Sequence, residues 1–198
     1  MSTTTVFVEL LIIGLESLVW LALLISSLFG LDWVPTIVST FEKADVFATI
    51  AVIGLAYIVG IVVDEICDSL IEPWAKRIRD SVQNDTKLKM WDIQAYVFSH
   101  SEVATSQLGY MRSRLRILRS SIFNIILVVV FALVFLWTRA AVAVDLKAGL
   151  TWFISAAGLL SVGCALFVYR RVALSYWLRA LGIYKSLKRE EKASVPAK

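Results

Sequence analysis

Charged residues are scarce in this chain. Of its 198 residues only 18% are Asp, Glu, Lys or Arg, whereas 59% are hydrophobic and the mean hydropathy is +0.76. In soluble domains about a quarter of all residues are charged, so this composition argues against a soluble enzyme. With 2 Cys, 3 Pro and 9 Gly, the chain also lacks the composition of a disulfide scaffold, a collagenous repeat or a disordered segment. We therefore expect a small polytopic membrane protein.

Motifs for catalysis and metal binding are also missing. The sequence has no Gly-x-x-x-x-Gly-Lys loop, no Gly-x-Ser-x-Gly elbow, no His-Glu-x-x-His helix and no Cys pair at metal-ligand spacing. The single His100 has no Cys near it, which disfavours a tetrahedral metal site. We predict a non-enzymatic protein without catalytic residues, metal or cofactor. The basic run Tyr110–Arg116 could contact nucleic acid, but beside a membrane it is more typical of a positive-inside anchor, so nucleic acid is not an expected partner.

Four apolar runs are long enough to be membrane-spanning helices. A hydrocarbon core of about 30 Å requires roughly 20 mostly apolar residues in a helix. The runs are continuous and do not alternate with polar residues, which favours helices over the strands of a barrel. The sequence therefore predicts an all-α polytopic membrane protein with four transmembrane helices and helical cytoplasmic extensions. The predicted spans cover residues 5–29, 47–63, 122–137 and 150–169.

Basic residues indicate the orientation. All of the 20 Lys and Arg residues except Lys43, Arg139 and Lys147 lie in 64–121 or after Tyr169. Positive charge is retained on the cytoplasmic side, so both termini and the middle loop should be cytoplasmic. The chain then divides into two spans, a cytoplasmic helical layer, two further spans and a cytoplasmic amphipathic tail. These four regions cover residues 1–63, 64–121, 122–169 and 170–198.

The cytoplasmic layer should contain several helices. The second span is expected to continue until Pro73, where the missing backbone donor should kink or end the helix. A short helix is predicted over Lys87–Phe98, with Trp91 among its apolar residues, and another should start near Ser101, because Ser99 and Glu102 have capping-box spacing. The tail Arg170–Glu191 has apolar residues at intervals of three and four, which predicts an amphipathic continuation of the fourth span.

Two charged stripes suggest an ion-pair ladder at the inner end of the spans. Acidic residues recur every four positions after the second span, and basic residues precede the third span. Because these two helices should be antiparallel, partners are expected where residue numbers sum to about 183. The predicted pairs are Asp64 with Arg119, Asp68 with Arg116 and Glu72 with Arg112. The alternative is two solvated faces whose arginines serve as topology signals and contact anionic lipid.

Two carboxylates in the first span are the most unusual polar residues. Glu9 and Glu16 lie seven residues apart and therefore share one helix face. A carboxylate within a membrane is costly and should face protein or water. One interpretation is an ion or proton pathway; the other is a hydrogen bond between helices, with Tyr57 or Ser17 as partner of Glu16. Glu9, near the inner interface, is expected to pair with a cytoplasmic arginine.

Small residues at intervals of four indicate close helix packing. Ala56 and Gly60 form such a pair on the second span. Ala157, Ser161 and Ala165 form a longer ridge on the fourth span. Small side chains let helix backbones approach closely in a membrane. Either ridge could pack within one subunit or between subunits.

Two stretches carry a resemblance to known proteins. Ala56–Asp64, followed by Arg112–Arg119 and Asn124, resembles segments of small four-span bacterial proteins of unassigned function. The overall plan is similar to the membrane subunits of phage-defence systems of the Kiwa type, in which a compact four-span protein is paired with a soluble partner. This resemblance implies a homo-oligomeric component of the bacterial inner membrane that docks a cytoplasmic protein in a defence or stress assembly. The rival hypothesis is an ion channel or pore-forming effector in which Glu16 and Glu9 line the pathway.

Overall fold

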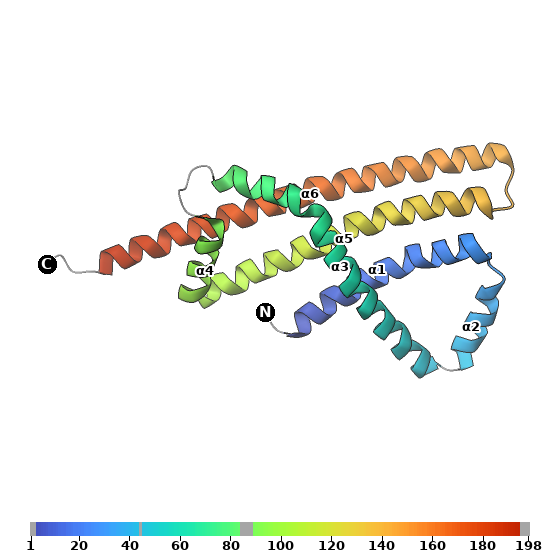
Figure 1. Cartoon of the computed structure of the whole chain (residues 1–198), viewed down its shortest axis with the longest axis horizontal. Coiled ribbons are helices and arrows are strands. Elements are labelled where there is room, and N and C mark those ends of the chain that lie inside the picture. Colours follow the sequence, from blue (N-terminus) through green and yellow to red (C-terminus); the bar gives the residue numbers. More distant parts are fainter. Residues whose placement is uncertain (1–2, 44, 84–88, 195–198) are drawn as a thin grey trace.

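The fold consists of helices and the short segments that connect them. A computed structural model describes residues 3–43, 45–83 and 89–194, and within these ranges it contains no strand (Figure 1). The helices are α1 (Thr3–Phe29), α2 (Trp33–Lys43), α3 (Asp45–Gln83), α4 (Met90–His100), α5 (Glu102–Thr138) and α6 (Val144–Ser194). The all-α prediction is confirmed.

Four of these helices are long and apolar enough to cross a membrane, as predicted. The candidate spans lie within Thr4–Phe29, Val46–Gln83, Glu102–Thr138 and Val144–Ala193. The predicted boundaries at residues 63/64, 121/122 and 169/170 fall inside α3, α5 and α6, which continue without a break from their apolar into their charged halves. Residues 170–194 therefore continue the helix of the fourth candidate span, as expected.

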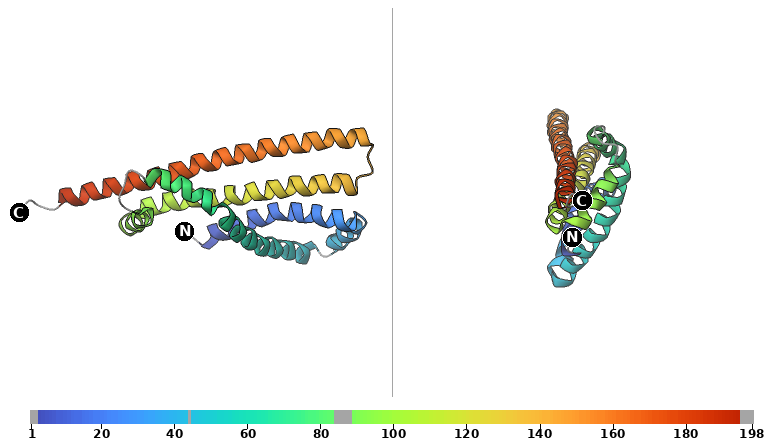
Figure 2. Two further views of the ribbon diagram at one scale, coloured as in Figure 1. Left: turned by 45° about the horizontal axis from the view of Figure 1, so that its top comes forward. Right: turned by 90° about the vertical axis from the view of Figure 1, so that its left-hand side faces the viewer.

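The long helices form an open row. α1 packs between α3 and α5, and α5 packs between α1 and α6 (Figure 2). The charged half of α3 also reaches α5 and α6, where Ile78 is buried with Ile122, Tyr169 and Ala173. The apolar half of α6 has α5 as its principal neighbour, so much of its surface is exposed.

The α1–α3 contact is close because both helices have glycine there. A Cβ atom on Gly14 would lie 1.6 Å from the carbonyl oxygen of Ala56, and one on Gly60 would lie 2.0 Å from that of Leu10. Real Cβ atoms do not approach a backbone so closely, so only glycine fits at these two positions. The predicted Ala56–Gly60 ridge therefore packs within the subunit, against α1.

The predicted small-residue ridge on α6, Ala157–Ser161–Ala165, lies in a different environment. Ala157 and Ser161 are exposed, whereas Ala165 packs against the cluster around Tyr169. The close contact with α5 is made by the neighbouring Gly158, where a Cβ atom would lie 2.5 Å from a methyl group of Val129. The face that carries Ala157 and Ser161 is thus left open by the single chain.

Helix α4 docks on α5 and α6 at the charged end of the molecule. Met90, Ile93 and Val97 are at most 2% exposed and pack against residues such as Leu108, Tyr176 and Leu181. Gln94 Nε2 donates to the hydroxyl of Tyr176 at 2.5 Å. Trp91, the remaining one of the apolar residues noted in the sequence of this helix, is 77% exposed and does not join these clusters. The predicted start of the helix at Lys87 lies outside the described residues.

Ser101 is the N-cap of α5, which confirms the expected helix start. Its hydroxyl accepts a hydrogen bond from the backbone N–H of Ala104 at 3.2 Å. The capping box does not form with Ser99, however, because the Ser99 hydroxyl lies 2.9 Å from the carbonyl oxygen of Tyr96.

Helix α3 does not end at Pro73. The helix runs through the proline to Gln83, and Figure 1 shows that its course bends. Proline removes one backbone hydrogen bond, which a long helix tolerates by kinking when both of its halves are packed. Of the two predicted outcomes, termination is therefore wrong.

Helix α2 was not expected from the sequence. It follows Gly30, whose φ of 82° is favourable for glycine and ends α1 with a hydrogen bond from Gly30 N–H to the carbonyl of Ser26. Arg139 also caps this end, because its Nε donates to the Ser27 carbonyl at 3.0 Å and its Nη2 donates to that of Leu28. A guanidinium is favourable at the negative end of a helix dipole, so Arg139 fastens α5 to the C-terminus of α1.

Candidate functional site

Five charged residues meet where α1, α3 and α5 pack together. Arg116 Nη1 lies 3.2 Å from Glu9 Oε2, and its Nε lies 3.3 Å from Asp64 Oδ2. Arg119 Nη2 lies 2.8 Å from Asp64 Oδ1, and its Nη1 contacts Asp68. We call Glu9, Asp64, Asp68, Arg116 and Arg119 the arginine cluster. Asp64 bridges both arginines, so three helices are joined by one network.

The arginine cluster corrects the predicted ladder. The Asp64–Arg119 pair is confirmed, but Asp68 also binds Arg119 and does not bind Arg116. Arg116 binds Glu9 and Asp64. The actual pairing differs because α1 supplies a third carboxylate between the two predicted stripes, and Arg116 turns toward it. Among the described residues, no ion pair joins Glu72 and Arg112, although both line the same cleft.

Burial makes the Glu9–Arg116 contact important for stability. Glu9 is 3% exposed and also accepts a hydrogen bond from the hydroxyl of Ser113. A buried carboxylate that loses its cationic partner destabilises a fold by several kcal/mol. The predicted pairing of Glu9 with a basic residue is confirmed, and the structure adds Ser113 as a second partner.

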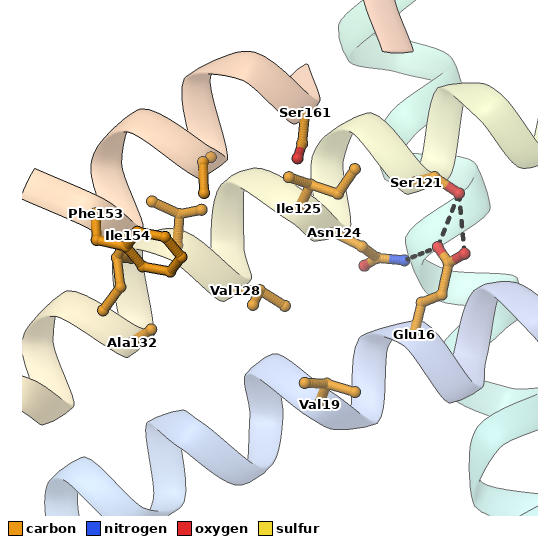
Figure 3. Close-up of a pocket in the computed structure, with 13 residues that line it drawn as sticks. Glu16, Val19, Ser121, Asn124, Ile125, Val128, Ala132, Phe153, Ile154 and Ser161 are labelled. Carbon is orange, nitrogen blue, oxygen red and sulfur yellow. Dashed lines mark hydrogen bonds between the residues drawn. The ribbon is translucent and has the colours of Figure 1, made fainter. Parts of the chain in front are cut away.

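A second polar cluster surrounds Glu16, two turns along α1. The Glu16 carboxylate accepts hydrogen bonds from Ser121 Oγ at 2.9 Å and from Asn124 Nδ2 at 3.2 Å (Figure 3). Asn124 Oδ1 accepts from Ser17 Oγ at 2.9 Å and from Trp20 Nε1 at 3.1 Å. We call these residues the Glu16 cluster. No ion pair involves Glu16 within the described part of the chain, so all of its partners are neutral.

The predicted partners of Glu16 are wrong, although the predicted kind of contact is found. Glu16 makes helix-to-helix hydrogen bonds with α5, whereas Ser17 binds Asn124. Tyr57 does not join the cluster; its ring lies 5.0 Å from that of Phe7. The sequence analysis did not identify Asn124 and Ser121 as hydrogen-bond partners of Glu16. The only indication in the sequence is that both are polar residues at the start of the apolar half of α5.

An apolar groove extends from Glu16 between α1, α5 and α6. Its volume is about 540 Å³. Glu16 lies at one end, and Phe153 and Ile154 lie at the other (Figure 3). The exposed Ala157 and Ser161 form part of the α6 wall. We call this the α1–α6 groove. Glu9 does not line it, because Glu9 is buried in the arginine cluster.

A second depression, the charged cleft, is lined by every residue of the arginine cluster except Glu9. Its volume is about 500 Å³, and α3, α4, α5 and α6 all contribute to it. α3 contributes acidic and basic residues, α5 contributes arginines, and aromatic side chains come from α4 and α6. The lining residues include Asp64, Asp68, Glu72, Arg112, Arg116, Arg119, Trp91, Tyr169, Tyr176 and Trp177.

The candidate ligands for metal or redox chemistry are dispersed. The described residues contain no group of three or more His, Cys, Asp or Glu side chains that could hold a metal ion. Cys67 of α3 is buried against α1 and α5, whereas Cys164 is exposed on α6. His100 stacks on Tyr96 with ring centroids 4.0 Å apart. Tyr96 donates to Glu191 at 2.8 Å, and this hydrogen bond raises the pKa of the phenol.

Comparisons with protein-family models, with curated proteins and with solved structures found no match to this chain.

Proposed function

We propose that this protein is a non-enzymatic, homo-oligomeric component of the bacterial inner membrane that docks a cytoplasmic protein as part of a defence or stress assembly. Both termini and the charged cleft would face the cytoplasm, as the distribution of Lys and Arg indicates. The resemblance in overall plan and in two short motifs supports the defence context, and the charged cleft and the arginine cluster support docking and coupling.

The observation that carries this proposal is the charged cleft. Three of the four candidate spans, α3, α5 and α6, continue unbroken into its walls. Trp91 is 77% exposed at this cleft, and exposed tryptophans are frequent anchors of protein interfaces. Asp68 is exposed beside it and supplies charge for the rim. A partner seated here would contact the ends of the same helices that cross the membrane.

The arginine cluster supports coupling between a docked partner and the spans. Arg116 and Arg119 line the charged cleft and also hold Glu9 on α1 and Asp64 on α3. A partner that displaced either guanidinium would release a contact between spans. Such a discrete rearrangement of packed helices is a known way to transmit binding across a protein.

The test is capture of the tagged full-length protein from its native host in nanodiscs, followed by native mass measurement. We expect a homo-oligomer with a stoichiometric soluble partner. The Trp91→Ala variant should lose the partner and keep the oligomer. Trp152→Ala is the matched control, because Trp152 is 78% exposed but belongs to the outer end of α6. Equal capture by both variants, or an oligomer without a partner, would contradict docking at the cleft.

The second candidate function is an ion channel or pore-forming effector. It is favoured by Glu16, a carboxylate with only neutral partners that lines the open α1–α6 groove. A second copy packed on this groove would enclose Glu16 between subunits, where it could bind a cation. Glu16→Gln should then abolish single-channel conductance in planar bilayers while the oligomer remains intact. Glu65→Gln is the control, since Glu65 is an exposed carboxylate of α3 that does not line the groove. Absence of conductance in the wild type would exclude this function.

A further inference from the structure

A second groove lies between α5 and α6, away from both polar clusters. Its volume is about 570 Å³, and we call it the α5–α6 groove. It is lined by Arg114 and Tyr110 from α5 and by residues of α6 on both sides of the predicted end of the fourth span. The α6 residues used in the following argument are Phe167, Val168, Arg171 and Arg179.

Three arginines line this groove, and none of them belongs to an ion pair within the described part of the chain. The lining includes Arg114, Arg171 and Arg179 and no carboxylate. Arg114 instead lies over the ring of Tyr110, 5.9 Å from its centroid. Arg116 and Arg119 lie two and five positions farther along α5, and in contrast to Arg114 they are paired with carboxylates of α1 and α3. Several cationic side chains that line one groove without carboxylates attract an anion.

The groove is apolar at one end and basic at the other. Phe167 is 67% exposed and Val168 is 38% exposed, and they are the last residues before Tyr169 and the basic tail. Arg171 follows Phe167 by four residues and therefore lies near the same face of the helix, and Arg179, farther along α6, also lines the groove. An amphiphile with a phosphate at the arginines and an acyl chain along Phe167 would match both ends. Guanidinium groups bind phosphate oxygens in a bidentate geometry.

We infer that the α5–α6 groove binds the phosphate headgroup of an anionic phospholipid of the cytoplasmic leaflet. This inference depends on the proposed membrane placement but not on the docking of a partner. Basic pockets between transmembrane helices on the cytoplasmic side bind lipid headgroups in this way.

The experiment reconstitutes the full chain in nanodiscs of phosphatidylcholine with a minor fraction of phosphatidylglycerol, and then counts retained lipids by native mass spectrometry. We expect phosphatidylglycerol to be enriched over phosphatidylcholine on the wild type. The triple variant R114Q/R171Q/R179Q should reduce this enrichment by about tenfold or more, since each basic contact near a membrane contributes on the order of 1 kcal/mol. The matched control R170Q/K185Q/R189Q removes equal charge from exposed positions that do not line the groove, and it should retain the enrichment.

Adjacent single variants guard against effects on folding. Arg171→Gln should weaken lipid retention, whereas Arg170→Gln should not, although the two residues are neighbours in the sequence. Equal losses in groove and control variants would overturn the site, because they would indicate attraction by net charge alone.

Displacement of the retained lipid by millimolar inorganic phosphate would also overturn the lipid site, in favour of a soluble phosphate ligand. Extraction of the wild type from membranes by alkaline carbonate would contradict the membrane placement itself. Loss of lipid selectivity with normal partner capture would refute only this inference.

Discussion

Glu9 and Glu16 lie on the same face of α1, seven residues apart, yet they have different surroundings. Glu9 is 3% exposed and bound to Arg116 and Ser113, so its charge is balanced inside the subunit. Glu16 is bound only to Ser121 and Asn124 and lines an open groove. The difference comes from α5, which presents a guanidinium at one level and neutral groups at the other. A carboxylate in an apolar helix therefore acquires its role from the helix that faces it.

This comparison separates a stabilising site from a candidate functional one. A buried carboxylate with a cationic partner contributes to the fold, and removal of the partner is strongly destabilising. A carboxylate with neutral partners can be replaced by an isosteric amide at a small cost in stability. The negative charge of such a group would therefore serve binding or conduction rather than folding. The following changes should distinguish the two sites, from the largest expected effect to the smallest.

Removal of Arg116 should be the most damaging change. Arg116→Met leaves Glu9 buried without a cation and deprives Asp64 of one partner, so we expect a loss of about 3–5 kcal/mol in unfolding free energy. Thermal or denaturant unfolding in detergent measures it. Arg114→Met, an exposed arginine without an ion pair on the same helix, is the control and should change stability by less than about 0.5 kcal/mol. Similar losses in both variants would show that the arginine cluster is not a stabilising site.

A larger side chain at the α1–α3 contact should destabilise the helix pair that carries Glu9, Glu16 and Asp64. A Cβ atom on Gly60 would lie 2.0 Å from the Leu10 carbonyl oxygen, so Gly60→Ala should cost about 1–3 kcal/mol by forcing the helices apart. Gly54 on the same helix has nothing within 4 Å of its Cβ position. Gly54→Ala should therefore be neutral or stabilising by up to about 1 kcal/mol. The melting temperatures of the two variants in detergent test this contrast, and equal values would refute close α1–α3 contact.

Asn124 should couple to Glu16 and not to Glu9. Asn124→Ala removes the amide that donates to Glu16 and accepts from Ser17 and Trp20, which should cost about 1–3 kcal/mol. A double-mutant cycle between Asn124→Ala and Glu16→Gln should give a coupling energy of about 0.5 kcal/mol or more. The same cycle with Glu9→Gln should give none, because Glu9 and Asn124 share no partner among the hydrogen bonds of the described residues. Coupling of equal size in both cycles would contradict two separate clusters.

The smallest effect on stability should come from Glu16→Gln. The amide oxygen can still accept from Ser121 and Asn124, so we expect a change of less than about 1 kcal/mol. Glu9→Gln should cost more, because it weakens the bond to Arg116 at a buried position. Chemical denaturation of the two variants under one condition gives the comparison directly. A larger loss for Glu16→Gln would assign Glu16 a structural role and weaken the channel hypothesis.

Individual residues show how far the site could be predicted. The Glu9–arginine contact followed from placing an acidic residue near a basic inner interface, and Asp64–Arg119 followed from antiparallel register. The partners of Asp68 and Glu16 could not be predicted this way. One helical turn is only about 5.4 Å. A small rotation or shift of α3 or α1 against α5 therefore decides which side chain of α5 each carboxylate can reach. Asn124 could be noted as polar, but nothing in its neighbours indicated that it faces Glu16.

The sequence by itself determined the all-α class, the four candidate spans and the helical continuation of α6, because hydropathy and helical periodicity are local properties that accumulate along each segment. The tertiary structure decided the order of the helices in the row, the bridging of Asp64, the neutral partners of Glu16 and the gathering of three arginines along the α5–α6 groove. Those features depend on how far each helix is rotated and shifted against its neighbours. Contacts such as Gly60 against the Leu10 backbone set that rotation, and they join residues that are distant in the chain.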